Sequence, residues 1–210
     1  MQPIAVGAAV VAAAAAAAVV FAARHRRRRG APPSWLIALL SSDDYERLRV
    51  AEWERGPSWR LSNGWVGTDY AHGEGAAVHI ADYGLGKTAK GYAKLVGAVH
   101  FSSGAESHKG LCHGGTMCTV MDDVIGWVGF CVSGTCKPWS GFTVQVNTSL
   151  TAPVKVGSWL RVEGEIYAVE RRKVRIRASL KAPADEALGT VECVHCTAEG
   201  LFVIKKEEAS

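Results

Sequence analysis

Hydrophobic and polar residues alternate most regularly in the last third of the chain. From residue 173 to residue 182, an apolar side chain stands at every second position. This is the period of a β-strand with one buried face. Further strands are predicted at residues 94–101, 142–150, 158–169 and 188–204. The order of these segments indicates an antiparallel sheet.

One segment between the predicted strands has a different pattern. Residues 114–132 are apolar on nearly every face of a helix, apart from the adjacent Asp122 and Asp123. A helix that is apolar all round is a buried one. One long antiparallel sheet wrapped around one central helix buries such a segment economically. The predicted fold class is therefore α+β, with the helix held inside the sheet.

The N-terminal part of the chain gives weaker patterns. Residues 34–55 place apolar residues among charges at helical spacing, which predicts an amphipathic helix. Residues 58–92 are rich in glycine and are expected to be irregular. The predicted organisation has three parts: residues 1–30, a membrane anchor or targeting segment; residues 31–93, a linker and N-terminal extension; and residues 94–205, the folded domain.

The first segment is uncharged from residue 3 to residue 23, and five arginines follow within residues 24–29. A run of this length can span a bilayer as a helix. Because basic residues stay on the cytoplasmic side, we expect an anchor with the domain facing the cytosol, on a mitochondrial or plastid outer membrane. The alternatives are a signal or targeting peptide, with the domain inside the organelle, and a buried soluble helix.

Charge argues against nucleic acid as a partner. The chain has 24 basic and 20 acidic residues. Without the five arginines of residues 24–29, 19 basic residues face 20 acidic ones. The folded part is nearly neutral and has no basic stripe of the kind that follows a phosphate backbone.

The six cysteines are expected to be inert, and we predict neither a metal nor a cofactor. Cys193 and Cys196 have half of a zinc-site spacing, but residues three apart on a strand point to opposite faces. No second pair of this spacing completes four ligands. Cys112 stands beside His113, but adjacent residues rarely adopt nucleophile–base geometry.

Acid–base chemistry is predicted at the buried helix. A carboxylate in apolar surroundings is either paired or functional. Residues His113, Gly114 and Gly115 open the helix, where free N–H groups carry partial positive charge and glycines admit a substrate oxygen. Such donors can form an oxyanion hole. An aspartate further along the helix could attack a carbonyl or activate water, which suits acyl hydrolysis.

The sequence GAVHFSSGAESHKGLCHGGTMCTVMDDVIGWVGF resembles the phenylacetyl-CoA-type branch of the hotdog-fold acyl-CoA thioesterases. It is especially similar to the mammalian thioesterase superfamily members 2, 4 and 5. In that family an aspartate follows the histidine of HGG by nine residues, as Asp122 follows His113. The resemblance covers roughly residues 94–204. It implies that Asp122 is catalytic, that Gly114 supplies the oxyanion contact, that Thr143 holds the water or the carboxylate, and that His113 fixes the loop.

The resemblance also implies partners and a substrate. Hotdog domains pair so that each site lies between subunits, so we expect a homodimer or a dimer of dimers, with Thr143 facing Asp122 of the other chain. The expected reaction is hydrolysis of a fatty acyl-CoA at a membrane surface, and the alternative is a non-catalytic, membrane-tethered subunit that binds acyl-CoA or serves in assembly. A hydratase of the same fold is disfavoured because no Asp–His pair lies near Asp122. The acyl tunnel is expected to involve Met121, Trp127 and Phe130, and the CoA phosphates to meet Arg171, Arg172 and Lys173.

Overall fold

The computed structural model describes residues 33–49, 77–80, 82–184 and 191–206. The chain divides into two units, residues 1–33 and residues 34–210, and the elements described here belong to the second. The predicted anchor at residues 3–23 and its basic flank lie outside the described residues. Within the described part, no helix is both long and apolar enough to cross a membrane.

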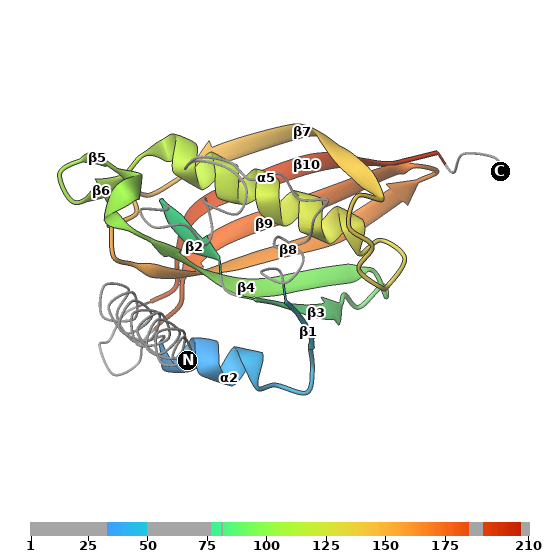
Figure 1. Cartoon of the computed structure of the whole chain (residues 1–210), viewed down its shortest axis with the longest axis horizontal. Helices are drawn as coiled ribbons and strands as arrows, with labels where there is room; N and C mark the ends of the chain where they lie inside the picture. The colour runs from blue at the N-terminus through green and yellow to red at the C-terminus, as the bar shows by residue number, and fades with distance from the viewer. Residues whose placement is uncertain (1–32, 50–76, 81, 185–190, 207–210) are drawn as a thin grey trace, which may run out of the picture. The chain divides into compact units, whose positions relative to one another are not determined.

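A single antiparallel sheet forms the body of this unit (Figure 1). Its strands lie in the order β1-β3-β4-β8-β9-β10-β7, and β2 pairs with β4. Their bounds are β1 Glu46–Leu48, β2 Val78–Ile80, β3 Tyr83–Lys87, β4 Ala93–Phe101, β7 Gly141–Leu150, β8 Trp159–Glu170, β9 Lys173–Ala182 and β10 Cys193–Ile204. The smaller elements are the helix α2 (Ser34–Leu40), a 3₁₀ turn at Ser103–Ala105, and a two-stranded ribbon of β5 (Glu106–His108) and β6 (Leu111–Cys112).

The long helix α5, Gly114–Phe130, lies across one face of the sheet (Figure 1). It packs against β4, β7, β8, β9 and β10. Close approach depends on small residues beneath it: a Cβ on Gly200 would lie 2.6 Å from Ile125, and one on Gly164 would lie 2.8 Å from Val128. The predicted α+β hotdog fold, with an antiparallel sheet around a buried helix, is confirmed.

Residues assigned to the N-terminal extension also contribute strands. The helix predicted over residues 34–55 is wrong beyond Leu40, because Glu46–Leu48 forms β1 and pairs with β3. The side chain of Tyr45 explains this local choice: a Cβ on Gly84 would lie 2.8 Å from the Tyr45 Cβ, and one on Gly86 would lie 2.9 Å from the Tyr45 ring. Aromatic packing on the bare backbone of β3 therefore overrides helical spacing. The segment predicted to be irregular, residues 58–92, contains β2 and β3.

The edge strand β7 contains a bulge. Its register with β10 shifts so that Leu201 stands opposite Gln145, whereas Phe202 stands opposite Thr143. Val144 is the extra residue on the β7 side. Because side chains alternate between the two faces of a strand, this one insertion reverses the faces to which the first residues of β7 point, relative to the rest of the strand.

Candidate functional site

The two adjacent aspartates of α5 have different surroundings. Asp123 accepts a hydrogen bond of 3.1 Å from the hydroxyl of Tyr83, a residue that is fully buried in the sheet. Asp122 is more exposed and lines a hollow beside the helix. Neighbouring residues on a helix are about 100° apart around its axis. One carboxylate is therefore held by the sheet while the other remains accessible to a substrate.

The hollow beside Asp122 has a volume of about 300 Å³ and is largely aromatic. We call it the Asp122 hollow. Its walls come from the second half of α5, the loop after it, the start of β7 and one residue of β10. Its lining residues are Asp122, Asp123, Gly126, Trp127, Phe130, Trp139, Gly141, Phe142, Thr143 and Phe202.

Thr143 reaches Asp122 within one chain. Its hydroxyl hydrogen-bonds to the Asp122 carboxylate. Gly126, one turn after Asp122, lies beside this contact: a Cβ there would be 3.6 Å from the Thr143 hydroxyl oxygen, an ordinary van der Waals distance. The expectation that Thr143 faces Asp122 of another chain is therefore corrected.

The bulge at Val144 explains why Thr143 points toward the helix. Val146 and Thr148 stand opposite Gly200 and Ala198, which are on the helix-facing side of β10. Strict alternation would place Thr143 on the other face, together with Asn147. Because the bulge shifts the phase by one residue, Thr143 instead stands opposite the buried Phe202.

Burial sets the protonation behaviour of Asp122. Partial desolvation raises the pKa of this carboxyl group above its ordinary value, and the hydrogen bond from Thr143 lowers the pKa in part. The side chain is still open to solvent in the single chain, so the carboxylate remains reachable. A carboxylate that is accessible and more basic than usual suits a general base or a nucleophile.

The start of α5 has the geometry expected for the HGG motif. His113 is the N-cap residue, and its Nδ1 accepts a hydrogen bond of 2.9 Å from the Gly115 N–H. The side chain of Leu150 covers Gly114, where a Cβ would lie 2.7 Å from it. However, Gly114 and Asp122 are eight residues apart on one helix, which is about 12 Å. The N–H of Gly114 and the Asp122 carboxylate of a single chain therefore cannot both contact one thioester carbonyl.

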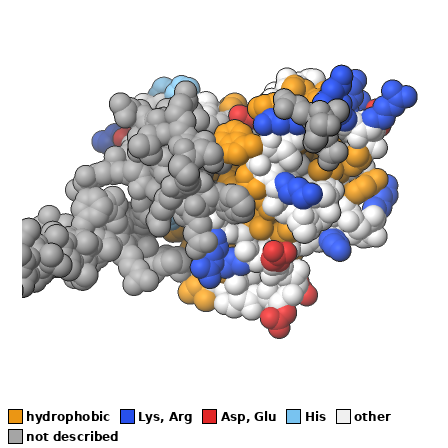
Figure 2. Space-filling model, turned by 45° about the vertical axis from the view of Figure 1, so that its right-hand side comes forward, with side chains coloured by type: hydrophobic (Ala, Val, Ile, Leu, Met, Phe, Trp, Pro, Cys, Tyr) orange, Lys and Arg blue, Asp and Glu red, His pale blue; other side chains and the backbone are white. Residues whose placement is uncertain are grey.

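Basic residues gather at the end of the sheet where the Asp122 hollow opens. Arg171 has φ 55° in the tight turn between β8 and β9, and the Arg172 guanidinium donates a 3.1 Å hydrogen bond to the carbonyl of Ile204. The Lys205 ammonium lies 4.8 Å from the ring centre of Phe142, a residue of the hollow. Figure 2, which brings this end of the sheet forward, shows Lys and Arg side chains around an apolar patch.

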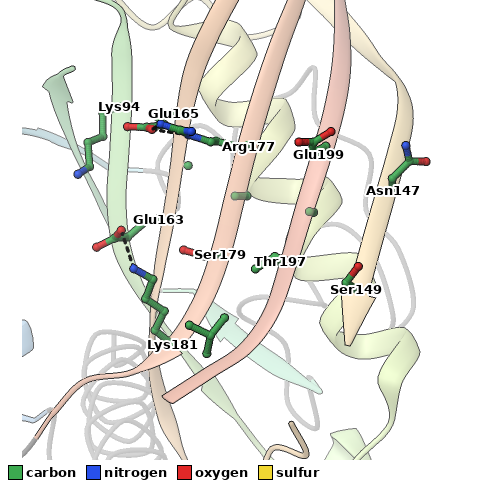
Figure 3. Close-up of a pocket in the computed structure, with 14 residues that line it drawn as sticks. Lys94, Asn147, Ser149, Glu163, Glu165, Arg177, Ser179, Lys181, Thr197 and Glu199 are labelled. Carbon is green, nitrogen blue, oxygen red and sulfur yellow. Dashed lines mark hydrogen bonds and ion pairs between the residues drawn. The ribbon is translucent and has the colours of Figure 1, made fainter. Parts of the chain in front are cut away.

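A larger hollow, of about 670 Å³, lies on the outer face of the sheet. Figure 3 shows two charge pairs across its strands: Arg177 donates a 2.6 Å hydrogen bond to Glu165, and Lys181 lies 3.5 Å from Glu163. None of the predicted catalytic residues lines it. We regard the smaller Asp122 hollow as the candidate site because its carboxylate is perturbed and lies among apolar walls.

The structure thus brings Asp122 and Thr143 together and leaves Gly114 and His113 at the far end of the helix. Of the three residues expected at the acyl tunnel, Trp127 and Phe130 line the hollow, whereas Met121 is fully buried and does not. The sequence reasoning missed three residues at the mouth: Trp139, Phe142 and Lys205. Their sequence signals were weak, since an aromatic in a loop or at the start of a strand is ordinary.

Comparisons with known proteins agree with the fold. Residues 109–187 match the family model described as the thioesterase superfamily. A putative thioesterase, yhdA, from Lactococcus lactis shares 14% identity over 61% of this chain and 94% of its own, with a TM-score of 0.50. A thioesterase superfamily protein shares 25% identity over 58% of this chain, with a TM-score of 0.44, and this chain covers 55% of its length. A hypothetical thioesterase protein from Streptococcus pneumoniae TIGR4, solved with coenzyme A, shares 18% identity over 60% of this chain and 88% of its own, with a TM-score of 0.46.

No match was found among curated proteins. The resemblance to hotdog-fold thioesterases, expected from the HGG motif and the helix that follows it, is confirmed by the family match and the fold. The narrower branch stays a prediction.

Proposed function

We propose that this chain, a hotdog fold with a thioesterase-superfamily match over residues 109–187, hydrolyses acyl-CoA thioesters to a free acid and CoA. The observation that carries the proposal is the Asp122 carboxylate, hydrogen-bonded to Thr143 and open to an aromatic hollow. The neighbouring Asp123 is held by Tyr83.

Asp122 supplies the base or the nucleophile of this reaction. As a base it takes a proton from water, whose oxygen then attacks the thioester carbonyl; as a nucleophile it attacks the carbonyl itself. The Thr143 hydroxyl holds one conformation of the carboxylate, because it donates a hydrogen bond to it. The raised pKa supports either role, since it makes the carboxylate more basic than one in water.

A dimer completes the site in this proposal. The outer edge of β7 pairs with no other strand among the described residues, and it exposes the apolar Phe142, Val144 and Leu150. Two β7 strands paired antiparallel about their midpoints would set Leu150 of each chain opposite Gly141–Phe142 of the other. Since Leu150 covers Gly114, this pairing brings the helix start of one chain toward Asp122 of the other. The oxyanion contact from Gly114 then acts across the dimer.

Two kinds of surface at the mouth support a fatty acyl-CoA as the substrate. Aromatic side chains suit a fatty acyl group, and the basic residues of the β8–β9 turn, together with Lys205, suit the CoA phosphates. We also propose that the enzyme works at a membrane surface, facing the cytosol. The support for this is the uncharged segment 3–23 and the arginines that follow it.

The test is a hydrolysis panel over acyl-CoA chain lengths, read as released CoA thiol. The wild-type protein is compared with Asp122→Asn and with its matched control Asp123→Asn, which changes the adjacent carboxylate in the same way. Asp122→Asn should lower kcat by several orders of magnitude and leave the fold intact. If the wild-type protein hydrolyses no acyl-CoA of any length, the enzyme proposal fails and a non-catalytic acyl-CoA-binding role replaces it.

A further inference from the structure

Two cysteines face each other across the loop that follows α5. Cys131 ends the helix and is fully buried, and Cys136 is half-buried and packs against the same core. The loop between them is closed by backbone hydrogen bonds: the Lys137 N–H donates to the Phe130 carbonyl at 2.9 Å, and the Gly134 N–H donates to the Cys131 carbonyl at 2.9 Å. Because a backbone hydrogen bond joins Phe130 to Lys137, the next residues along the loop, Cys131 and Cys136, lie opposite one another.

The two thiols are in contact. The backbone closure of the loop brings them together, and their interaction lowers the pKa of the Cys136 thiol and raises that of the Cys131 thiol. Cys136 is the reachable member, since the residues from Ser133 to Thr135 are exposed and Cys136 is itself partly exposed. A thiol with a lowered pKa and partial exposure, next to a second thiol, has the features of a redox-active pair.

The same loop forms a wall of the Asp122 hollow. Phe130 directly precedes Cys131, and Trp139 follows Cys136 by three residues. Their ring centres are 6.1 Å apart. Trp139 has φ 66°, a left-handed conformation that is strained for a bulky side chain. Beyond it, the Lys205 N–H donates a 2.8 Å hydrogen bond to the Ser140 carbonyl and ties the loop to the end of β10.

We propose that Cys131 and Cys136 form a reversible dithiol–disulfide couple that narrows the Asp122 hollow when oxidised. The link to substrate selection rests on the proposed thioesterase function; the redox couple itself does not. A hydroperoxide is the oxidant: the Cys136 thiolate attacks one peroxide oxygen, the O–O bond breaks, and a sulfenic acid forms as the alcohol or water leaves. The Cys131 thiol then attacks the Cys136 sulfur, the S–O bond breaks, and the hydroxide leaves as water with the proton of the Cys131 thiol. A dithiol reductant returns both protons and both electrons.

Forming the Cys131–Cys136 disulfide should change the shape of the loop and therefore the activity on long acyl chains. Forming the bond brings the two sulfur atoms from contact distance to about 2 Å. The loop must shorten on that side, which draws the Trp139 end toward Phe130. We therefore expect oxidation to lower kcat/KM for long acyl chains by about threefold, the equivalent of about 0.6 kcal/mol of lost transition-state binding. Short acyl chains, which do not fill the hollow, should be affected less.

The experiment uses the full chain carrying Cys193→Ser, because the exposed Cys193 would otherwise form disulfides between molecules. The protein is treated with hydrogen peroxide and then with a dithiol, and the remaining thiols are counted and mapped by peptide mass. Five cysteines remain in this background, from six in the chain less Cys193. Two should be lost on oxidation and recovered on reduction. The matched control adds Cys136→Ser, a partly exposed position at which folding should be retained.

The outcomes separate the redox couple from the proposed function. A reversible Cys131–Cys136 bond, with a chain-length-dependent loss of kcat/KM that is absent in the Cys136→Ser control, supports the proposal. No disulfide, or one that joins Cys118 to Cys196 instead, overturns it. A Cys131–Cys136 bond that leaves long-chain and short-chain activity equally unchanged overturns the link to the hollow. If the reduced protein hydrolyses nothing, the enzyme proposal fails, but the link to the hollow can still be tested by tryptophan fluorescence. A fluorescence change on oxidation that is present in wild type and absent in Trp139→Phe shows that the hollow responds.

Discussion

Replacing Tyr83 with phenylalanine tests whether the two aspartates of α5 have different roles, one in stability and one in catalysis. The change removes the hydroxyl that donates a 3.1 Å hydrogen bond to Asp123 and keeps the ring, which is fully buried. Hydrogen bonds to charged groups contribute about 1.5–3 kcal/mol, and the partial exposure of Asp123 favours the lower end. At about 2–4 °C per kcal/mol for a unit of this size, Tm should fall by roughly 3–6 °C. The hydrolysis rate should change little, because Asp122 and Thr143 are untouched.

The assay is thermal or urea unfolding, measured beside kcat on one acyl-CoA. The matched variant is Asp122→Asn, for which we expect activity to be lost and stability to be retained. Desolvation raises the folded-state pKa of Asp122, so its ionisation destabilises the fold at pH values above that pKa and has no effect below the unfolded value of about 3.9. At neutral pH, Asp122→Asn should therefore remove activity and keep or increase stability. If Tyr83→Phe or Asp123→Asn abolishes hydrolysis without lowering Tm, the assignment of roles to the two aspartates is wrong.

Three further predictions follow from the site and the sequence. Thr143→Ala removes the hydrogen bond that lowers the pKa of Asp122. The acid limb of the pH profile of kcat/KM, on which this carboxylate becomes protonated, should therefore move to higher pH. An unmoved limb would show that Asp122 is not the titrating base. Replacing the basic residues 171–173 with alanine should raise KM for acyl-CoA more than it lowers kcat, and an unchanged KM at low salt would exclude a phosphate contact there. The full-length protein should resist carbonate extraction from membranes, and protease added outside intact organelles should remove its domain. Deletion of residues 1–30 should give a soluble, active enzyme. Protection of the domain until the organelle is broken would contradict the cytosolic orientation.

Period and length were sufficient to predict the five long strands from residue 94 onward and the buried helix, but not the short ribbon of β5 and β6. The alternation in β9 and the nearly continuous apolar residues of α5 both reflect the core that lies between the sheet and the helix. The short strands β1, β2 and β3 could not be predicted in this way. Glu46–Leu48 has too few residues to show a period, and it is a strand because β3 offers it a partner and two glycines that accommodate Tyr45.

The site was predictable only in part. The HGG spacing selected Asp122 through a family resemblance, whereas helical periodicity could not have distinguished it from Asp123. That distinction depends on Tyr83, a residue forty positions away whose hydroxyl reaches only one of the two carboxylates. Trp139 and Lys205 reach the mouth of the hollow through the closure of a loop and the end of a strand. Neither position carries a periodic signal.

The bulge at Val144 has a second consequence, for association with wrong partners. A long, open edge strand with exposed apolar side chains invites pairing with any extended segment, and this is a route to aggregation. An extra residue bends the strand and increases its local twist, so a flat strand cannot follow the whole edge. The feature that aims Thr143 at Asp122 therefore also makes the edge of β7 a poor template for indiscriminate strand pairing.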